Sequence, residues 1–192
     1  MKFIIVGLHS SGKRDVIDML EKWGVNCGHN FSDIPTVKDS IYGSKNYELY
    51  TTKDVNDVFE NDAYVFIQEK KHNDRKYYEG LSKYSFDNNS VFSMSPDQLL
   101  VTSFNNIQEP VCLVWLDNTK NNRYNKYLTD RSRYNFNDIE AQETLDLSTF
   151  VKIIYSQKYL YFTNEEPNRI AAIIYSLIQH EELLPIYLDT YK

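Results

Sequence analysis

The chain has 192 residues, of which 42% are hydrophobic and 25% are charged, and its formal net charge at pH 7 is −6. These values are typical of a globular protein whose single domain is large enough for a real core. The negative charge argues against a general nucleic-acid-binding protein, because a grip on phosphate backbones needs a basic surface. It leaves open a small phosphorylated ligand, which needs only a local cluster of cations and backbone N–H groups.

The two cysteines and the apolar runs indicate a cytoplasmic protein with no membrane partner. Cys27 and Cys112 are far apart and form neither a disulfide framework nor a zinc spacing, and Cys112 lies in an apolar run that predicts a buried free thiol. The apolar run at residues 2–6 is too short and wrongly flanked for a signal peptide. No apolar stretch approaches the length of a transmembrane helix.

The first predicted elements are a strand, a tight turn and a helix. Residues 3–6 are continuously apolar, which is typical of a fully buried strand. A turn rich in glycine and serine follows at residues 7–12. Residues 14–23 then carry apolar side chains at helical spacing, and Gly24 ends this predicted helix.

The middle region, about residues 30–85, is polar and rich in tyrosine. It contains three short strand-like runs, at residues 47–50, 64–68 and 76–81, and a helix is expected at residues 54–61. Short runs of this kind predict a small antiparallel lobe inserted into the main domain.

Alternating strands and helices return after this lobe. Strands are expected at residues 90–94, 111–116 and 159–162, and helices at residues 96–104, 119–129, 138–150 and 167–183. Strands that alternate with helices predict a parallel sheet, here of about five strands, covered by helices on both faces.

The turn at residues 7–13 carries the strongest functional signal. Its sequence, Gly-Leu-His-Ser-Ser-Gly-Lys, matches the P-loop pattern G-x-x-x-x-G-K and lies between a buried strand and a helix, as that motif requires. Glycines allow successive N–H groups to face one anion, and the helix adds its N-terminal N–H groups and dipole. Lys13 is predicted to reach the β- and γ-phosphates of ATP. The alternative is an ordinary turn with a lysine by chance. The predicted phosphate-binding residues are Gly7, His9, Ser10, Ser11, Gly12, Lys13 and Arg14.

Arg14 departs from the P-loop pattern. The position after the lysine normally holds a serine or threonine whose hydroxyl binds Mg²⁺. A guanidinium cannot bind a cation, so Arg14 is expected either to contact phosphate or to replace part of the metal's charge. Mg²⁺ is therefore a doubtful cofactor, and Asp97, after the strand at 90–94, is its candidate ligand.

With these motifs in place, the chain resembles the P-loop nucleoside monophosphate kinases, guanylate kinase most closely. The resemblance implies an α/β three-layer sandwich of the P-loop NTPase type with an inserted acceptor-binding lobe. Residues 46–49 are similar to the family's D-Y-x-F segment, residues 64–69 to the stretch ending in F-x-E, and residues 76–81 to Y-Y-G-T. By this resemblance Tyr47 and Tyr78 contact the acceptor phosphate and Glu69 reads the acceptor base.

The same resemblance implies a lid over the reacting phosphates at about residues 128–140. Arg131 and Arg133 look like the lid arginines, which with Lys13 would carry phosphoryl transfer. Residues 162–164 look like the family's V-x-N ending, in which Asn164 borders the donor base.

Two main hypotheses remain open. The first is a divergent nucleoside or deoxynucleoside monophosphate kinase, with nucleoside mono- and triphosphates as ligands. The second is a guanylate-kinase-like binding module without catalysis, which is favoured by Arg14 and by the absence from residues 31–38 of the family's arginine-bearing T-T-R-x-P-R segment. A small P-loop hydrolase ranks last, because no N-K-x-D-like base motif is present. A homodimer is compatible with the sequence.

Overall fold

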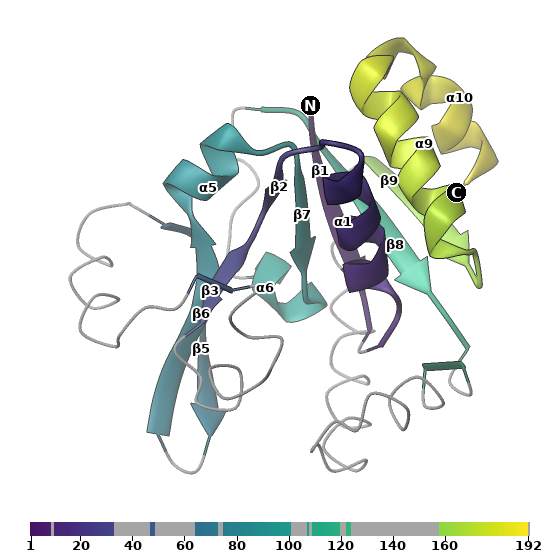
Figure 1. Cartoon of the computed structure of the whole chain (residues 1–192). Helices are drawn as coiled ribbons and strands as arrows, with labels where there is room; N and C mark the ends of the chain where they lie inside the picture. The colour runs from purple at the N-terminus through teal and green to yellow at the C-terminus, as the bar shows by residue number, and fades with distance from the viewer. Residues whose placement is uncertain are drawn as a thin grey trace.

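The computed structural model describes residues 1–8, 10–32, 47–48, 64–72, 75–100, 107, 109–119, 122–123 and 158–191. Its centre is a sheet of five parallel strands, in the order β2-β7-β1-β8-β9 (Figure 1). These strands are β1 (Lys2–Gly7), β2 (Cys27–Gly28), β7 (Val91–Met94), β8 (Val111–Asp117) and β9 (Lys158–Thr163). The predicted parallel sheet is confirmed, including its continuously apolar first strand.

Alternate side chains of β1 face two separate cores, which is why the strand is apolar throughout. Phe3 and Ile5 pack against the helices α1 (Lys13–Lys22), α9 (Pro167–Gln179) and α10 (Leu184–Thr190). Ile4 and Val6 pack on the opposite face, in a core shared with the helices α5 (Lys83–Asn88) and α6 (Pro96–Leu100). The molecule is therefore a three-layer α/β sandwich, as predicted.

A second sheet forms the inserted lobe, with the strand order β4-β3-β6-β5. Its strands are β3 (Asn30–Ser32), β4 (Tyr47–Glu48), β5 (Tyr64–His72) and β6 (Arg75–Ser82). β3 and β5 both run antiparallel to β6, and β4 pairs in parallel with β3. Only His29 separates β2 from β3, so the chain passes directly from the central sheet into the lobe, at the lower left of Figure 1.

The closing helix differs from the prediction of one helix over residues 167–183. α9 ends at Gln179, a short 3₁₀ turn covers Glu181–Leu183, and α10 then begins at Leu184. The break lies at His180, whose φ of −138° and ψ of 74° are not helical, and Pro185 stands in the first turn of α10, where a proline is tolerated.

Other elements were missed, or lie outside the described residues. The sequence interpretation missed α5, although Ser82 caps it by accepting a hydrogen bond of 3.0 Å from the N–H of Ser85. It also missed β2, which has only two residues. The helices expected at residues 54–61 and 138–150 lie outside the described residues, as does most of the one expected at 119–129.

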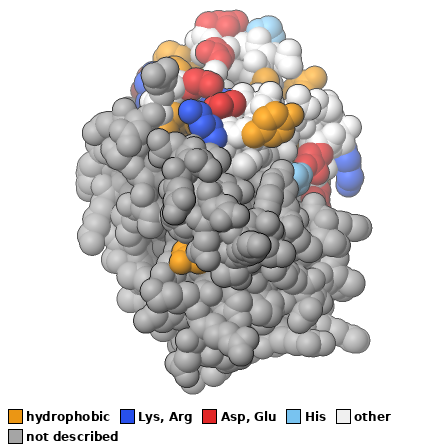
Figure 2. Space-filling model, turned by 90° about the vertical axis from the view of Figure 1, so that its left-hand side faces the viewer, with side chains coloured by type: hydrophobic (Ala, Val, Ile, Leu, Met, Phe, Trp, Pro, Cys, Tyr) orange, Lys and Arg blue, Asp and Glu red, His pale blue; other side chains and the backbone are white. Residues whose placement is uncertain are grey.

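None of the helices within the described ranges is long and apolar enough to cross a membrane. On the described part of the lobe-side face, acidic side chains lie beside basic ones, with hydrophobic side chains scattered among them (Figure 2).

Both cysteines are buried free thiols, as expected for Cys112, and burial raises the pKa of each to about 12.

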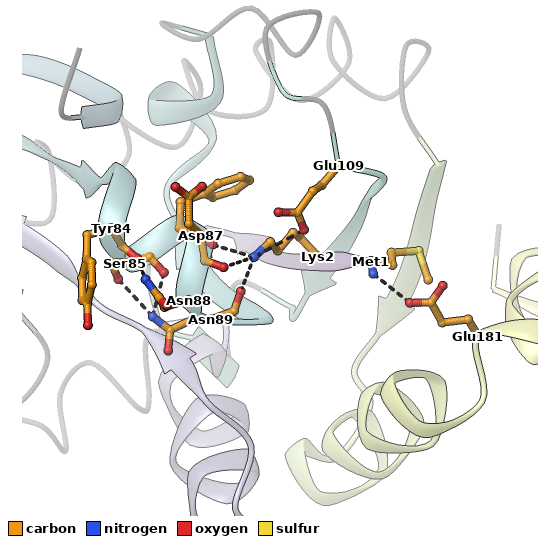
Figure 3. A network of polar contacts seen from close by, with 10 residues as sticks. Met1, Lys2, Tyr84, Ser85, Asp87, Asn88, Asn89, Glu109 and Glu181 are labelled. Atoms are coloured by element: carbon orange, nitrogen blue, oxygen red, sulfur yellow. Dashed lines mark hydrogen bonds and ion pairs between the residues drawn. The ribbon is translucent and has the colours of Figure 1, made fainter.

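Lys2 forms a buried junction at the end of the sheet opposite the P-loop (Figure 3). Its Nζ donates to three backbone carbonyls at the end of α5, those of Phe86 (2.7 Å), Asp87 (3.0 Å) and Asn89 (2.8 Å). It also lies 3.4 Å from the carboxylate of Glu109. One ammonium group therefore fixes α5, and with it the base of the lobe, to β1.

Replacing Lys2 by methionine is expected to lower the free energy of unfolding by about 2–3 kcal/mol, because methionine keeps the apolar stem but leaves buried carbonyls without their charged donor. Urea unfolding followed by circular dichroism measures this loss. Lys158→Met, at an exposed position on β9, is the control and should change stability little. A loss for Lys2→Met no larger than that of the control would contradict the assigned role.

Candidate functional site

The loop between β1 and α1 lies at the carboxyl edge of the central sheet and has a strongly curved backbone. Ser10 has φ of 57° and Gly12 has φ of 97°, so two residues of the turn lie in the left-handed region. Residues of this kind turn successive N–H groups toward one side of a loop. Gly12 is also the N-cap of α1, which has no side-chain cap, and Val16 N–H donates the helix's first hydrogen bond, to Gly12 O. The first-turn N–H groups of α1 therefore point toward the loop.

Gly7 is required by close packing. A Cβ at this position would lie 2.5 Å from Ser11 Oγ and 2.6 Å from the backbone oxygen of Leu116 on β8. The second contact is with backbone that cannot rotate away. Any side chain here would push the loop away from the sheet edge that supports it.

The side chain of Lys13 folds back and bonds to the start of the loop. Its Nζ donates to Gly7 O at 2.6 Å and to Leu8 O at 2.9 Å. Both partners belong to the limb of the loop that leaves β1. The ammonium group is thus held at the start of the loop by two carbonyls, and the predicted phosphate contact stays a prediction.

Neither Arg14 nor Ser11 presents the hydroxyl with which a P-loop normally binds Mg²⁺. The Nε of Arg14 lies 3.6 Å from Asp18 Oδ2, one turn further along α1. The side chain of Ser11 is buried, and its Oγ has no hydrogen-bond partner among the described residues. This hydroxyl faces the space beside Gly7, inside the loop.

A short segment after β8, residues 117–119, braces the loop from the side. Asn118 Nδ2 donates to Ser11 O at 2.8 Å, and Arg123 Nε donates to Asn118 O at 3.0 Å. Thr119 N–H donates to Asn164 Oδ1 at 2.9 Å, while Asn164 N–H donates to Asp117 O at 2.8 Å. We call residues 117–119 the brace.

The side chain of Asn164, for which a contact with the donor base is predicted, accepts a hydrogen bond from Thr119. It follows β9, has φ of 51°, and joins β9 to the brace through both its backbone and its side chain. The predicted contact with the donor base stays a prediction.

Tyr161 fixes the first residue of the brace. Its hydroxyl donates to Asp117 Oδ2 at 2.6 Å, joining the ends of β8 and β9. Burial and the adjacent Asp117 carboxylate raise the pKa of Tyr161 to about 12, so the phenol keeps its proton at neutral pH. This bond occupies one carboxylate oxygen at the sheet edge beside the loop.

The lobe brings two of the predicted acceptor contacts together. Glu69 on β5 and Tyr78 on β6 are direct partners in the antiparallel register. Tyr78 is half-buried. Tyr47 lies on β4, where it pairs with Asn30 of β3.

A buried pair of amides lies where the lobe meets the central sheet. Asn30 Nδ2 donates to Ser93 O at 3.0 Å, and Gln98 Oε1 accepts from the N–H of Ser95 at 3.0 Å. These backbone partners fix the orientation of both amides. Asn30 Oδ1 and Gln98 Nε2 remain buried without a hydrogen-bond partner among the described residues.

Several predicted site residues cannot be placed. His9, Arg131 and Arg133, with the whole expected lid at 128–140, lie outside the described residues. Asp97 lies in α6, but its side chain is outside the described part of the structure, as are the side chains of Tyr47 and Glu69. Within the described ranges, no group of three or more His, Cys, Asp or Glu residues could hold a metal ion.

Sequence interpretation missed four polar residues of the site: Asn30, Gln98, Asn118 and Arg123. Asn118 carried a usable signal, because it is polar and lies two residues after the apolar run of a parallel strand, where ligand sites gather. Arg123 fell inside the helix predicted at residues 119–129, and its side chain is buried. Asn30 and Gln98 are far apart in the sequence, and only the tertiary structure brings them together.

Comparison with known proteins identifies the fold. No protein-family model matches the chain, and no curated protein matches its sequence. The solved guanylate kinase from Anaplasma phagocytophilum is similar with a TM-score of 0.58 at 11% identity, covering 94% of this chain and 85% of that one. The deoxyadenosine kinase from M. mycoides, solved with bound dCTP, gives a TM-score of 0.49 at 12% identity and covers 93% of this chain and 100% of that one. The chain has a fold like that of the P-loop nucleoside monophosphate kinases.

Proposed function

We propose that this protein is a divergent nucleoside or deoxynucleoside monophosphate kinase, which transfers the γ-phosphoryl group of ATP to a nucleoside monophosphate. The observation that carries the proposal is the position of Lys13, whose ammonium group lies over a loop with two left-handed residues at the carboxyl edge of a parallel sheet. A cation at a loop whose conformation turns N–H groups toward one side is suited to a polyphosphate.

Binding of the donor begins with an exchange of partners. In the present structure Lys13 Nζ is bonded to two loop carbonyls. On binding, it gives up these carbonyls for β- and γ-phosphate oxygens, while the loop N–H groups surround the same phosphates. Because charge-assisted bonds to phosphate are stronger than bonds to neutral carbonyls, the exchange favours the bound state.

The acceptor is proposed to lie between the loop and the lobe. Glu69 and Tyr78 are cross-strand partners on the lobe sheet, which supports a shared role in acceptor recognition. Asn30 and Gln98 add polar groups at the junction of the lobe and the sheet. Arg131 and Arg133 are proposed to close over the transferred group, where one such arginine contributes roughly 10³-fold or more in rate.

The described residues around the loop do not fit the Mg²⁺ site usual for a P-loop. The residue that should supply a hydroxyl is Arg14, which lies beside Asp18, and Ser11 Oγ is buried inside the loop. The proposal therefore assigns phosphate binding to Lys13 and the backbone N–H groups.

An assay of ADP release tests the activity directly. The protein is incubated with ATP and each common ribo- and deoxyribonucleoside monophosphate, with and without Mg²⁺, and ADP formation is followed by a coupled reaction. The proposal predicts turnover with at least one acceptor. The absence of turnover with every acceptor, in a protein that binds ATP, would eliminate the kinase.

ATP binding without turnover would support a binding module without catalysis. The observation that favours this alternative is the ion pair of Arg14 with Asp18, at the position where a metal-binding hydroxyl is usual. A binding module should hold ATP with similar affinity in Mg²⁺ and in EDTA. Strong dependence of that affinity on Mg²⁺ would count against it.

A further inference from the structure

We infer that Asn118 is a positioning residue for the phosphate loop, which sets the direction of the Gly12 N–H by holding the carbonyl of Ser11. The inference rests on the proposed function, since it concerns the same phosphate site. Asn118 lies 107 positions from Ser11 in the sequence and is outside the motif itself.

The fold brings Asn118 to the loop through strand register. β8 runs parallel to β1, and Leu116 is the register partner of Gly7. Two residues later, Asn118 is level with the start of the loop and donates from Nδ2 to Ser11 O at 2.8 Å. The acceptor is a carbonyl, so the amide must present its nitrogen, and its orientation is fixed.

Holding this carbonyl fixes a whole peptide unit. In a trans peptide the carbonyl and the following N–H point in opposite directions. With Ser11 O bonded to Asn118, the Gly12 N–H points away from the brace. Ser10 and Gly12 both have positive φ, and this pattern turns loop N–H groups toward a common anion.

Glycine tolerates a wide range of φ, so the Ser11–Gly12 peptide has more than one possible direction, which is why an anchor has an effect. Gly12 is buried and its own carbonyl accepts from the N–H of Val16, while a Cβ at Gly12 would meet nothing closer than 3.8 Å. Lys13 secures the other limb of the loop, through Gly7 and Leu8. Asn118 is itself held, because its carbonyl accepts from the buried Arg123. The bond from Asn118 therefore selects one of the directions that the glycine allows.

Titration with inorganic triphosphate tests the inference without any contribution from base recognition. Asn118→Ala should weaken binding about tenfold, the equivalent of one net hydrogen bond. Asn118→Asp should weaken it more, about 30-fold, because a carboxylate cannot donate and repels the anion. Asn122→Ala, an exposed asparagine four residues further along, is the matched control and should bind as the wild type does.

The amide signal of Gly12 supplies a readout that general destabilisation would not move. The chain has six glycines, so the Gly12 cross-peak in a ¹H–¹⁵N spectrum can be assigned. It should shift in ligand-free Asn118→Ala, and its response to triphosphate should shrink. Binding is measured well below the melting temperature of each variant, with a dispersed spectrum as proof of folding.

The outcomes separate this inference from the proposed function. Folded Asn118→Ala that binds triphosphate like the wild type, or that weakens binding without moving the Gly12 signal, overturns the inference alone. A wild-type protein that does not bind triphosphate overturns the proposed function, and the inference falls with it.

Discussion

Replacing Lys13 by alanine is expected to weaken ATP binding by more than 100-fold. The variant removes the ammonium group that lies over the loop and is proposed to pair with the β- and γ-phosphates. Removing one partner from a hydrogen-bonded charge pair typically costs about 2–5 kcal/mol, and 2.8 kcal/mol corresponds to about 100-fold. Isothermal titration calorimetry with ATP measures the change.

Lys22→Ala is the matched control for this variant. Lys22 is in the last turn of the same helix, where its side chain is exposed. Its loss removes the same formal charge from the protein but leaves the loop intact, so ATP affinity should stay within about twofold. Equal effects of the two variants would mean that Lys13 acts only through net charge.

The second large effect is expected from Gly7→Ala. The new Cβ would lie 2.6 Å from the backbone oxygen of Leu116, so β1 and β8 must shift apart or the loop must move. Overpacking of this kind costs about 1–3 kcal/mol, which lowers the melting temperature by roughly 2–12 °C in a chain of this size. ATP affinity should fall as well, because the loop leaves its support.

Gly24→Ala separates backbone strain from damage to the loop. Gly24 has φ of 83° and open space around it, and it follows the other end of α1. Alanine there is expected to cost about 1–2 kcal/mol through the left-handed conformation, with no change in ATP affinity. A Gly7→Ala protein that melts and binds like the wild type would show that the loop does not rest on Leu116.

The parts of the structure that could be predicted are those with a local signal. The apolar run of β1, the glycines of the loop and the amphipathic α1 each follow from a pattern within about ten residues. The break after Gln179 had no such signal, because neither glycine nor proline stands at His180, where the helix ends.

The remaining parts depend on contacts between distant residues. The bond from Asn118 to the loop exists only because Leu116 pairs with Gly7 in the sheet, and sequence alone does not give a register of that kind. The facing positions of Glu69 and Tyr78 have the same origin. Residue types and motifs predicted a phosphorylated ligand. The residues that position the loop could be recognised only from the fold.

A crystal structure with a non-hydrolysable ATP analogue tests the central claim most directly. The account predicts β- and γ-phosphate density against the N–H groups of residues 10–14, with Lys13 Nζ moved from the carbonyls of Gly7 and Leu8 to the phosphate oxygens. A structure at saturating analogue in which the loop is unchanged, or in which the nucleotide binds elsewhere, would contradict it.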